Sequence, residues 1–225
     1  PSITSSSTFT ADENQTAIGT VTATDADGDG IAYSISGSDI TIDASSGVIS
    51  FVSAPDYETK TSYTATVTAS DGTNSTTQNI TVNITNLNDN APSITSSSTF
   101  TVNENQTAIG QVTATDADGD SITFSISGSE ININSSTGVL TFASAPDYET
   151  KTSYTATVTA SDGTNSTTQN ITVNINNLND NAPSITSNAT FTADENQTAI
   201  GTVTATDPDG DDITFSISGS EININ

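Results

Sequence analysis

The 225-residue sequence has no cysteine, no histidine and no arginine, and each absence removes a class of site. Without cysteine there are no disulfides, no thiolate chemistry and no zinc-finger sites, and cysteine usage indicates no redox compartment. The 27 acidic residues have only two lysines, Lys60 and Lys151, as internal counter-charges. The formal net charge of −25 makes nucleic acid and anionic membranes poor partners. It also requires solvent, salt or bound cations to relieve the repulsion between carboxylates.

Long apolar runs and tryptophan are missing as well. No segment approaches the length of a membrane span, so we predict no membrane span in this fragment. The chain opens at Pro1 without a signal peptide, and we expect any targeting or anchoring element to lie outside the fragment. Few aromatic residues and many Thr, Ser and Asn are typical of a secreted surface protein. We therefore expect an extracellular or cell-surface location.

The phrase PSITS occurs three times, starting at Pro1, Pro92 and Pro183, which gives an internal period of about 91 residues. The chain is therefore predicted to be an array, with linkers at the NDNAP phrases, where a proline ends the last strand and stiffens the exit. Copies that match even at polar positions argue against a specialised ligand pocket in each one. The predicted domains are residues 1–91, residues 92–182 and a truncated third repeat, residues 183–225, which holds only the first strands.

Apolar residues alternate with polar ones within each copy, for example at residues 31–35, 63–69 and 80–84. A period of two places the apolar residues on one face of a β-strand. Turn sequences such as DADGDG, SSG, PDYE and SDGTN separate these runs, and no segment has the helical period. About seven short strands in about 91 residues predict an all-β fold, a two-sheet antiparallel sandwich in each repeat.

Acidic residues recur at four places in each full copy, within the sequences ENQ, DAD, DYE and ASDG, and the linker adds a fifth within NDNAP. In a sandwich the loops that carry them lie at the two ends of the domain. Domains stacked end to end would therefore bring these carboxylates together. A single acidic loop residue is usually just solvated, but a matched set in register is a stronger signal.

The set ENQ, ATDAD, DYE, ASDG and NDNAP, in this order and with these intervals, resembles the calcium-binding signature of cadherin repeats, and it extends along the whole chain. The resemblance implies tandem seven-stranded Greek-key sandwiches, similar to immunoglobulin domains and joined end to end by calcium-binding linkers. It also implies about three Ca²⁺ ions at each junction. DADGD is similar to the start of an EF-hand loop too, but the acid that closes such a loop is absent.

Carried over position by position, the resemblance implies two sets of metal ligands. The first junction takes Glu13, Asp56, Glu58, the Leu87 carbonyl, Asn88, Asp89, the Asn90 carbonyl, Asp116, Asp118 and Asp162. The second takes Glu104, Asp147, Glu149, Leu178, Asn179, Asp180, Asn181, Asp207 and Asp209. Asp25, Asp27 and Asp71 are expected to face a linker before Pro1, and Glu195 one beyond the fragment.

Two departures from the family pattern stand out. The family usually begins its linker with Asp, where this chain has Asn86 and Asn177, which removes a nearby negative charge. The loop after DAD is also shorter than usual. That leaves open whether Asp29, Asp120 and Asp211 replace a carbonyl ligand or face water.

The donor chemistry favours calcium independently of the resemblance. Oxygen ligands without His or Cys suit a hard cation, and many flexible carboxylates suit Ca²⁺ better than Mg²⁺. Seven carboxylates gathered at one junction are nearly balanced by three divalent ions. Without ions, each like-charged pair at about 4 Å costs on the order of 1 to 4 kcal/mol. We expect a calcium-controlled hinge with an affinity of roughly 0.1 to 1 mM.

Three functional hypotheses follow. The leading one is a calcium-rigidified extender array of a bacterial or archaeal surface adhesin or extracellular fibre, which mediates calcium-dependent cell adhesion. In the second, the repeats bind directly, either to identical chains or to polysaccharide. In the third, they assemble laterally into a filament by strand addition. Paired carboxylates such as Asp56 and Glu58 could do glycosidase chemistry, but this needs a cleft, so we expect no enzyme activity.

Overall fold

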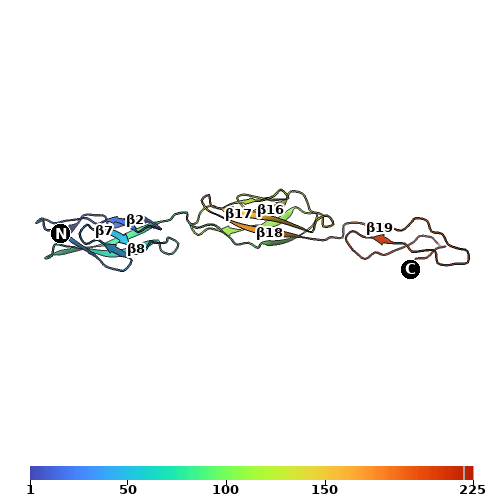
Figure 1. The fold of residues 1–225 in the computed structure, drawn as a ribbon, viewed down its shortest axis with the longest axis horizontal. Coiled ribbons are helices and arrows are strands. Elements are labelled where there is room, and N and C mark those ends of the chain that lie inside the picture. Colours follow the sequence, from blue (N-terminus) through green and yellow to red (C-terminus); the bar gives the residue numbers. More distant parts are fainter. Residues whose placement is uncertain (220, 225) are drawn as a thin grey trace. The chain divides into compact units, whose positions relative to one another are not determined.

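The computed structural model describes residues 1–219 and 221–224, and the chain divides into two compact units. Unit 1 comprises Pro1–Ala91 and Asp116–Ser121, and unit 2 comprises Pro92–Thr115 and Ile122–Asn225. The described residues form strands and turns and no helix. They therefore contain no transmembrane helix. The predicted all-β class is confirmed (Figure 1).

Unit 1 is a sandwich of two sheets. One sheet has the strand order β2–β9–β8–β5 and the other has the order β3–β7–β6. Strands β1 and β4 form a separate short antiparallel pair. The two sheets together contain seven strands, in agreement with the prediction of about seven. All of residues 1–91 are described. The strands are β1 (Ser2–Ile3), β2 (Thr8–Asp12), β3 (Ala17–Thr20), β4 (Ala23–Thr24), β5 (Ala32–Ile35), β6 (Ile40–Ile42), β7 (Val48–Phe51), β8 (Ser62–Ser70) and β9 (Ser75–Thr85).

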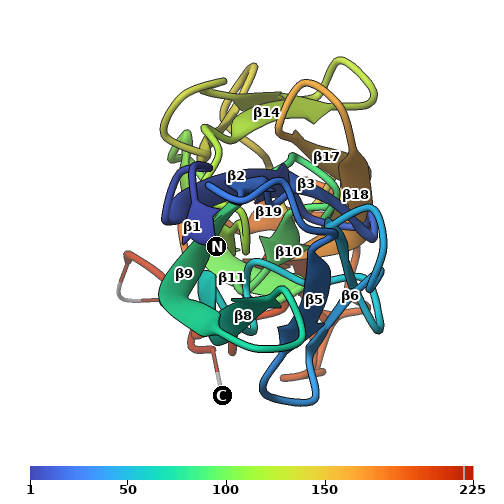
Figure 2. The same ribbon diagram turned by 90° about the vertical axis from the view of Figure 1, so that its left-hand side faces the viewer.

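Strand β9 lies in the interior of its sheet and delivers the chain to the linker. Its apolar residues Ile80, Val82 and Ile84 are buried, and alternate residues face outward, as the period of two predicts. It pairs antiparallel with β8 and parallel with β2, and Figure 2 shows β8 and β9 as adjacent strands. Because β9 ends at Thr85, the linker that begins at Asn86 starts directly from a strand held on both sides.

Unit 2 repeats this architecture, with sheets β11–β18–β17–β14 and β12–β16–β15 and the short pairs β10–β13 and β19–β20. Between Thr186 and the last described residue, β20 is the sole strand. The strands are β10 (Ser93–Ile94), β11 (Thr99–Asn103), β12 (Ala108–Gln111), β13 (Ala114–Thr115), β14 (Thr123–Ile126), β15 (Ile131–Ile133), β16 (Val139–Phe142), β17 (Ser153–Ser161), β18 (Ser166–Asn176), β19 (Ser184–Ile185) and β20 (Ala205–Thr206).

The turn between β6 and β7 in unit 1 corresponds to the turn between β15 and β16 in unit 2. The two turns differ in one titratable residue. In unit 1 the Asp43 carboxylate accepts hydrogen bonds from the backbone N–H of Ser46 at 2.8 Å and from the hydroxyl of Ser45 at 2.8 Å. These hydrogen bonds hold the pKa of Asp43 well below its usual range. In unit 2 the amide oxygen of Asn134 takes the same place and accepts from the backbone N–H of Thr137 at 3.0 Å.

Replacing Asp43 with Asn is therefore expected to reduce the acid sensitivity of unit 1. A depressed carboxyl pKa contributes stability above the unfolded value of about 3.9, and this contribution is lost as pH falls through the folded value. The difference in melting temperature between the wild type and Asp43→Asn should shrink as pH falls from about 5 to about 2. The reciprocal change, Asn134→Asp, should make unit 2 acid-sensitive. A difference that stays constant across this range would contradict the assignment.

Candidate metal centre

Glu13 is the buried acid of unit 1. It follows β2 directly and is 2% exposed, although a carboxylate is costly to bury without partners. Its two oxygens accept hydrogen bonds from the backbone N–H groups of Tyr57 and Leu87, each at 2.8 Å. Glu13 thus fixes the DYE turn and the linker to the end of β2, while its negative charge faces no lysine within the described residues.

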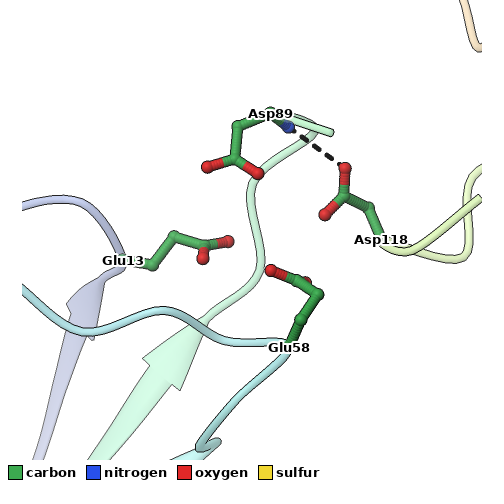
Figure 3. Close-up of side chains that lie close together, drawn as sticks. All are labelled: Glu13, Glu58, Asp89 and Asp118. Atoms are coloured by element: carbon green, nitrogen blue, oxygen red, sulfur yellow. Dashed lines mark hydrogen bonds between the residues drawn. The ribbon is translucent and has the colours of Figure 1, made fainter. Parts of the chain in front are cut away.

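Four carboxylates from four chain segments converge in unit 1. Glu13 follows β2, Glu58 lies in the DYE turn, Asp89 lies in the linker, and Asp118 lies in the loop after β13. Each offers an oxygen, and these oxygens lie within 4.8 Å of one another. Figure 3 shows the four side chains pointing toward a common centre. Because repulsion opposes this arrangement, a bound positive charge would stabilise it when all four groups are ionised.

The DYE turn makes contacts on both of its sides. The Asp56 carboxylate accepts from the Thr59 backbone N–H at 3.2 Å and from the Thr59 hydroxyl at 3.0 Å. The ammonium of Lys60 donates to Asp39 at 2.9 Å and lies 3.9 Å from the ring centroid of Tyr63. These contacts fix the backbone that carries Glu58. Asp56 itself is outside the group of four carboxylates.

The loop Asp116–Ser121 gathers a second acidic group. Asp116, Asp118 and Asp120 each offer an oxygen within 4.8 Å of the others. The backbone N–H of Asp120 donates to Asp116 Oδ1 at 3.2 Å. Asp116 Oδ2 is shielded from solvent and has no hydrogen-bond partner among the described residues. Asp120, which the sequence leaves open, therefore lies close enough to share a cation with the predicted ligands.

Unit 2 repeats the pattern. Glu104 is 2% exposed and accepts from the backbone N–H groups of Tyr148 and Leu178, each at 2.7 Å. Here Asp147, the counterpart of Asp56, does join the cluster. The carboxylate groups of unit 2 are Glu104, Asp147 and Glu149; Glu149, Asp180 and Asp209; and Asp207, Asp209 and Asp211.

The remaining predicted ligands lie in different surroundings. Asp25 and Asp71 lie together, with one oxygen of each at 3.0 and 3.8 Å from the amine of Pro1, and Asp27 donates its backbone N–H to Asp25 at 2.9 Å. Asp162 lies in unit 2, so its contribution to the first junction stays a prediction. Glu195 is exposed, unlike Glu13 and Glu104, because the described residues around it form only the short β19–β20 pair and no sandwich.

The cadherin domain family model matches residues 7–85 and 98–176, which is more than half of the chain. The chain belongs to the cadherin family. Cadherin repeats are typical of extracellular cell-adhesion domains, and cadherin domains bind calcium at the junctions between repeats. A search of the curated proteins gives no match.

Solved cadherin structures share the fold of this cadherin chain. Mouse cadherin-23 EC22-24 is 27% identical with a TM-score of 0.73, and the match covers 89% of this chain and 74% of that one. A protocadherin gammaB7 EC3-6 cis-dimer structure is 26% identical with a TM-score of 0.70, over 92% of this chain and 55% of that one. Human CDH23 EC21-23 is 20% identical with a TM-score of 0.73, and the match covers 92% of this chain and 80% of that one. At this identity the match supports the fold alone.

The residues that the structure brings together fit calcium. Every donor is an oxygen, and no nitrogen or sulfur ligand is available because the chain has no His or Cys. A buried carboxylate at Glu13 and an unpartnered shielded oxygen on Asp116 are both groups that a divalent cation would satisfy. Glu13, Glu58, Asp89 and Asp118 would hold such an ion in unit 1, and it would neutralise their charge and cross-link their chain segments.

Three asparagine side chains make contacts with the acidic groups that the sequence did not predict. The amide of Asn14 donates to Asp89, and the backbone of Asn14 has a φ of 62°, which Asn tolerates better than most residues. The amide of Asn90 donates to Asp118 at 3.0 Å, whereas the sequence predicts a role for its carbonyl alone. Asn86 donates to the Asp118 carbonyl. The recurrence of ENQ marks Asn14, but no sequence signal gives the direction of these amides.

The pKa values of Glu58 and Asp118 are shifted in opposite directions, and these shifts predict how pH acts on the cluster. Desolvation and the negative charge of Glu13 raise the pKa of Glu58, while hydrogen bonds from Asn90 lower the pKa of Asp118. Glu58 therefore takes up a proton at a higher pH than Asp118 does. Glu149 and Asp209 repeat these directions in unit 2.

Calcium binding is accordingly expected to release protons and to weaken as pH falls through the raised pKa of Glu58. In chelator a fall in pH has the opposite effect and stabilises the fold, because a raised folded-state pKa makes the fold more stable when Glu58 is protonated. The melting temperature in chelator should therefore rise slightly as pH falls from neutral toward the raised pKa of Glu58. Calorimetry of calcium binding in buffers with different ionisation enthalpies measures the proton release. Proton uptake on binding would contradict the assignment.

Proposed function

We propose that this cadherin chain is a calcium-rigidified extender segment of an extracellular adhesin or surface filament and works in calcium-dependent cell adhesion. The observation that carries the proposal is the convergence of Glu13, Glu58, Asp89 and Asp118 within unit 1, together with the two groups of three carboxylates that share Glu149 in unit 2. The chain has a formal net charge of −25, so gathering acids at one place raises their mutual repulsion. A cation bound there would remove this repulsion and stiffen the linker.

The linker is the element on which calcium would act. Its residues Leu87 and Asp89 lie between Glu13, fixed to the sandwich of unit 1, and Asp118, which lies in the loop after β13. An ion shared by these carboxylates would replace their repulsion by attraction to a common charge. The proposed work of the chain is therefore mechanical, without catalysis, and its copies act as spacers.

Small-angle scattering tests the mechanical proposal. In calcium the chain should have a larger maximum dimension and a narrower distribution of conformations than in chelator. The matched variant Asp89→Asn with Asp180→Asn keeps the shape of the linker side chains but removes one carboxylate from each cluster. It should need more calcium to reach the same dimension. Identical scattering of the wild type in calcium and in chelator would end the rigid-array proposal.

Direct binding of polysaccharide is a second candidate, and a hollow on the outer face of unit 2 favours it. The hollow has a volume of about 430 Å³ and an uncharged polar lining, in which the Thr157 hydroxyl donates to Asn170 Oδ1 at 2.8 Å, a bond that a sugar hydroxyl would have to share or replace. Retention on a polysaccharide column, lost when Thr157 is replaced by Val, would support this role, and free passage through the column would oppose it. The lining residues are Ser127, Thr155, Ala156, Thr157, Asn170, Ile171 and Thr172.

A further inference from the structure

The linker after β9 holds Asp118 through four hydrogen bonds from neutral donors, all within unit 1. The side-chain amide of Asn86 donates to the main-chain carbonyl of Asp118 at 2.8 Å. The backbone N–H groups of Asp89 and Asn90 donate to Asp118 Oδ2 at 3.1 and 2.9 Å, and the Asn90 amide donates to Oδ1 at 3.0 Å. Figure 3 shows the bond from Asp89. We call this set of four bonds the clasp.

The clasp recurs around Asp209 in unit 2 with the same atoms. The amide of Asn177 donates to the Asp209 carbonyl at 2.7 Å. The backbone N–H groups of Asp180 and Asn181 donate to Oδ2 at 3.1 and 2.8 Å, and the Asn181 amide donates to Oδ1 at 3.0 Å. Both acidic loops are therefore gripped by their linkers through donors that carry no charge.

The bond from Asn86 requires an amide and excludes a carboxylate. A main-chain carbonyl accepts hydrogen bonds and cannot donate, so the NH₂ end of Asn86 must face Asp118. The oxygen of Asn86 is shielded from solvent and accepts no hydrogen bond from the described residues. An ionised Asp at this position would place two acceptors face to face and add a negative charge beside Glu13 and Asp118. The Asn at the start of the linker therefore makes a contact that Asp cannot make.

We propose that Asn86 and Asn177 are positioning residues of a metal-independent clasp, so that the linker grips the acidic loop before any calcium binds. Amide and backbone donors need no metal, and hydrogen bonds to an ionised carboxylate are stronger than those between neutral groups. Calcium then tightens a linker that is already formed. The proposal goes beyond the proposed function and depends on it only for that last step.

Amide hydrogen exchange of the full chain in chelator, followed by NMR, tests the clasp at the N–H groups of Asp89 and Asn90. The wild type should protect both. Asn86→Ala and Asn86→Asp should each speed their exchange by roughly 2- to 10-fold, the effect of losing one hydrogen bond. The amides of Asp180 and Asn181, in the second clasp, are an internal control that should not change. The amides of β9 report whether the sandwich itself stays folded.

The outcomes separate the clasp from the calcium proposal. Asp89 and Asn90 amides that exchange at the rate of an unstructured chain in chelator would overturn the clasp, whatever calcium does. An unchanged rate in Asn86→Ala would overturn it as well. Protection in chelator that calcium does not alter would support the clasp and count against the calcium proposal. If Asn86→Ala also exposes β9, the reciprocal variant Asn177→Ala decides, because it should accelerate only Asp180 and Asn181.

Discussion

Replacing Glu13 with Gln is expected to remove most of the stabilisation that calcium gives to unit 1. Glu13 is 2% exposed and lies in the group of four carboxylates, so the change takes a buried negative charge from the site. Calcium at about 100 times Kd stabilises a protein by about 2.7 kcal/mol. For a domain of this size that corresponds to a rise in melting temperature on the order of 10 °C. The variant should lose most of this rise.

The same variant is expected to be less stable in chelator too, for a separate reason. Both oxygens of Glu13 accept backbone N–H groups, from Tyr57 and Leu87, and Gln can accept with only one. A buried donor left unpaired costs about 1 to 3 kcal/mol. The calcium effect is therefore the difference between the melting temperatures in calcium and in chelator, measured by calorimetry.

Asp12→Asn is the matched control, because Asp12 is the adjacent acid, is exposed and belongs to no carboxylate group of the described residues. It should leave the difference between calcium and chelator unchanged. If Glu13→Gln kept the full calcium-dependent rise, Glu13 would not be a ligand.

Replacing Gly47 with Ala is expected to destabilise unit 1 by roughly 3 kcal/mol or more, from a strained backbone and an overpacked site. Gly47 has a φ of 72°, and an added Cβ would lie 2.2 Å from the main-chain oxygen of Val21. That oxygen belongs to the backbone beside β3 and cannot move aside as a flexible side chain would. Gly138 meets Val112 in the same way in unit 2. Chemical denaturation measures the free energy of unfolding.

Gly37→Ala separates the two causes. Gly37 also has a positive φ, 99°, but nothing lies within 4 Å of its added Cβ. It should cost only the backbone strain, about 1 kcal/mol. Equal losses in the two variants would show that the contact with Val21 contributes nothing.

The strands were predictable because their signal is local. Ile80, Val82 and Ile84 repeat with a period of two, and this alone places them on the buried face of β9. The sandwich fold predicts that the acidic loops meet, but the choice of Glu13, Glu58 and Asp89 as members of one group came through the resemblance to cadherin repeats. Nothing in the spacing of these residues says that β2 lies parallel to β9 and brings Glu13 to the start of the linker.

The details of the clusters depend on directions that a sequence does not carry. Asp56 and Asp147 lie in identical DYE turns, yet Asp147 alone joins its carboxylate group. Asp120 was left open and proves close to Asp116 because its loop turns back on itself. Asn86 was identified only as a missing negative charge. Its amide bond to Asp118 depends on where the loop Asp116–Ser121 places one carbonyl, and composition and spacing do not encode this.

Calorimetric titration of the whole chain with calcium tests the central claim most directly, that acids from separate chain segments converge on shared divalent ions. The account predicts saturable binding of several ions with affinities of roughly 0.1 to 1 mM. Binding should weaken in the variant that carries both Asp89→Asn and Asp180→Asn. A titration that shows only heat of dilution up to about 10 mM calcium, well above that range, would contradict the account.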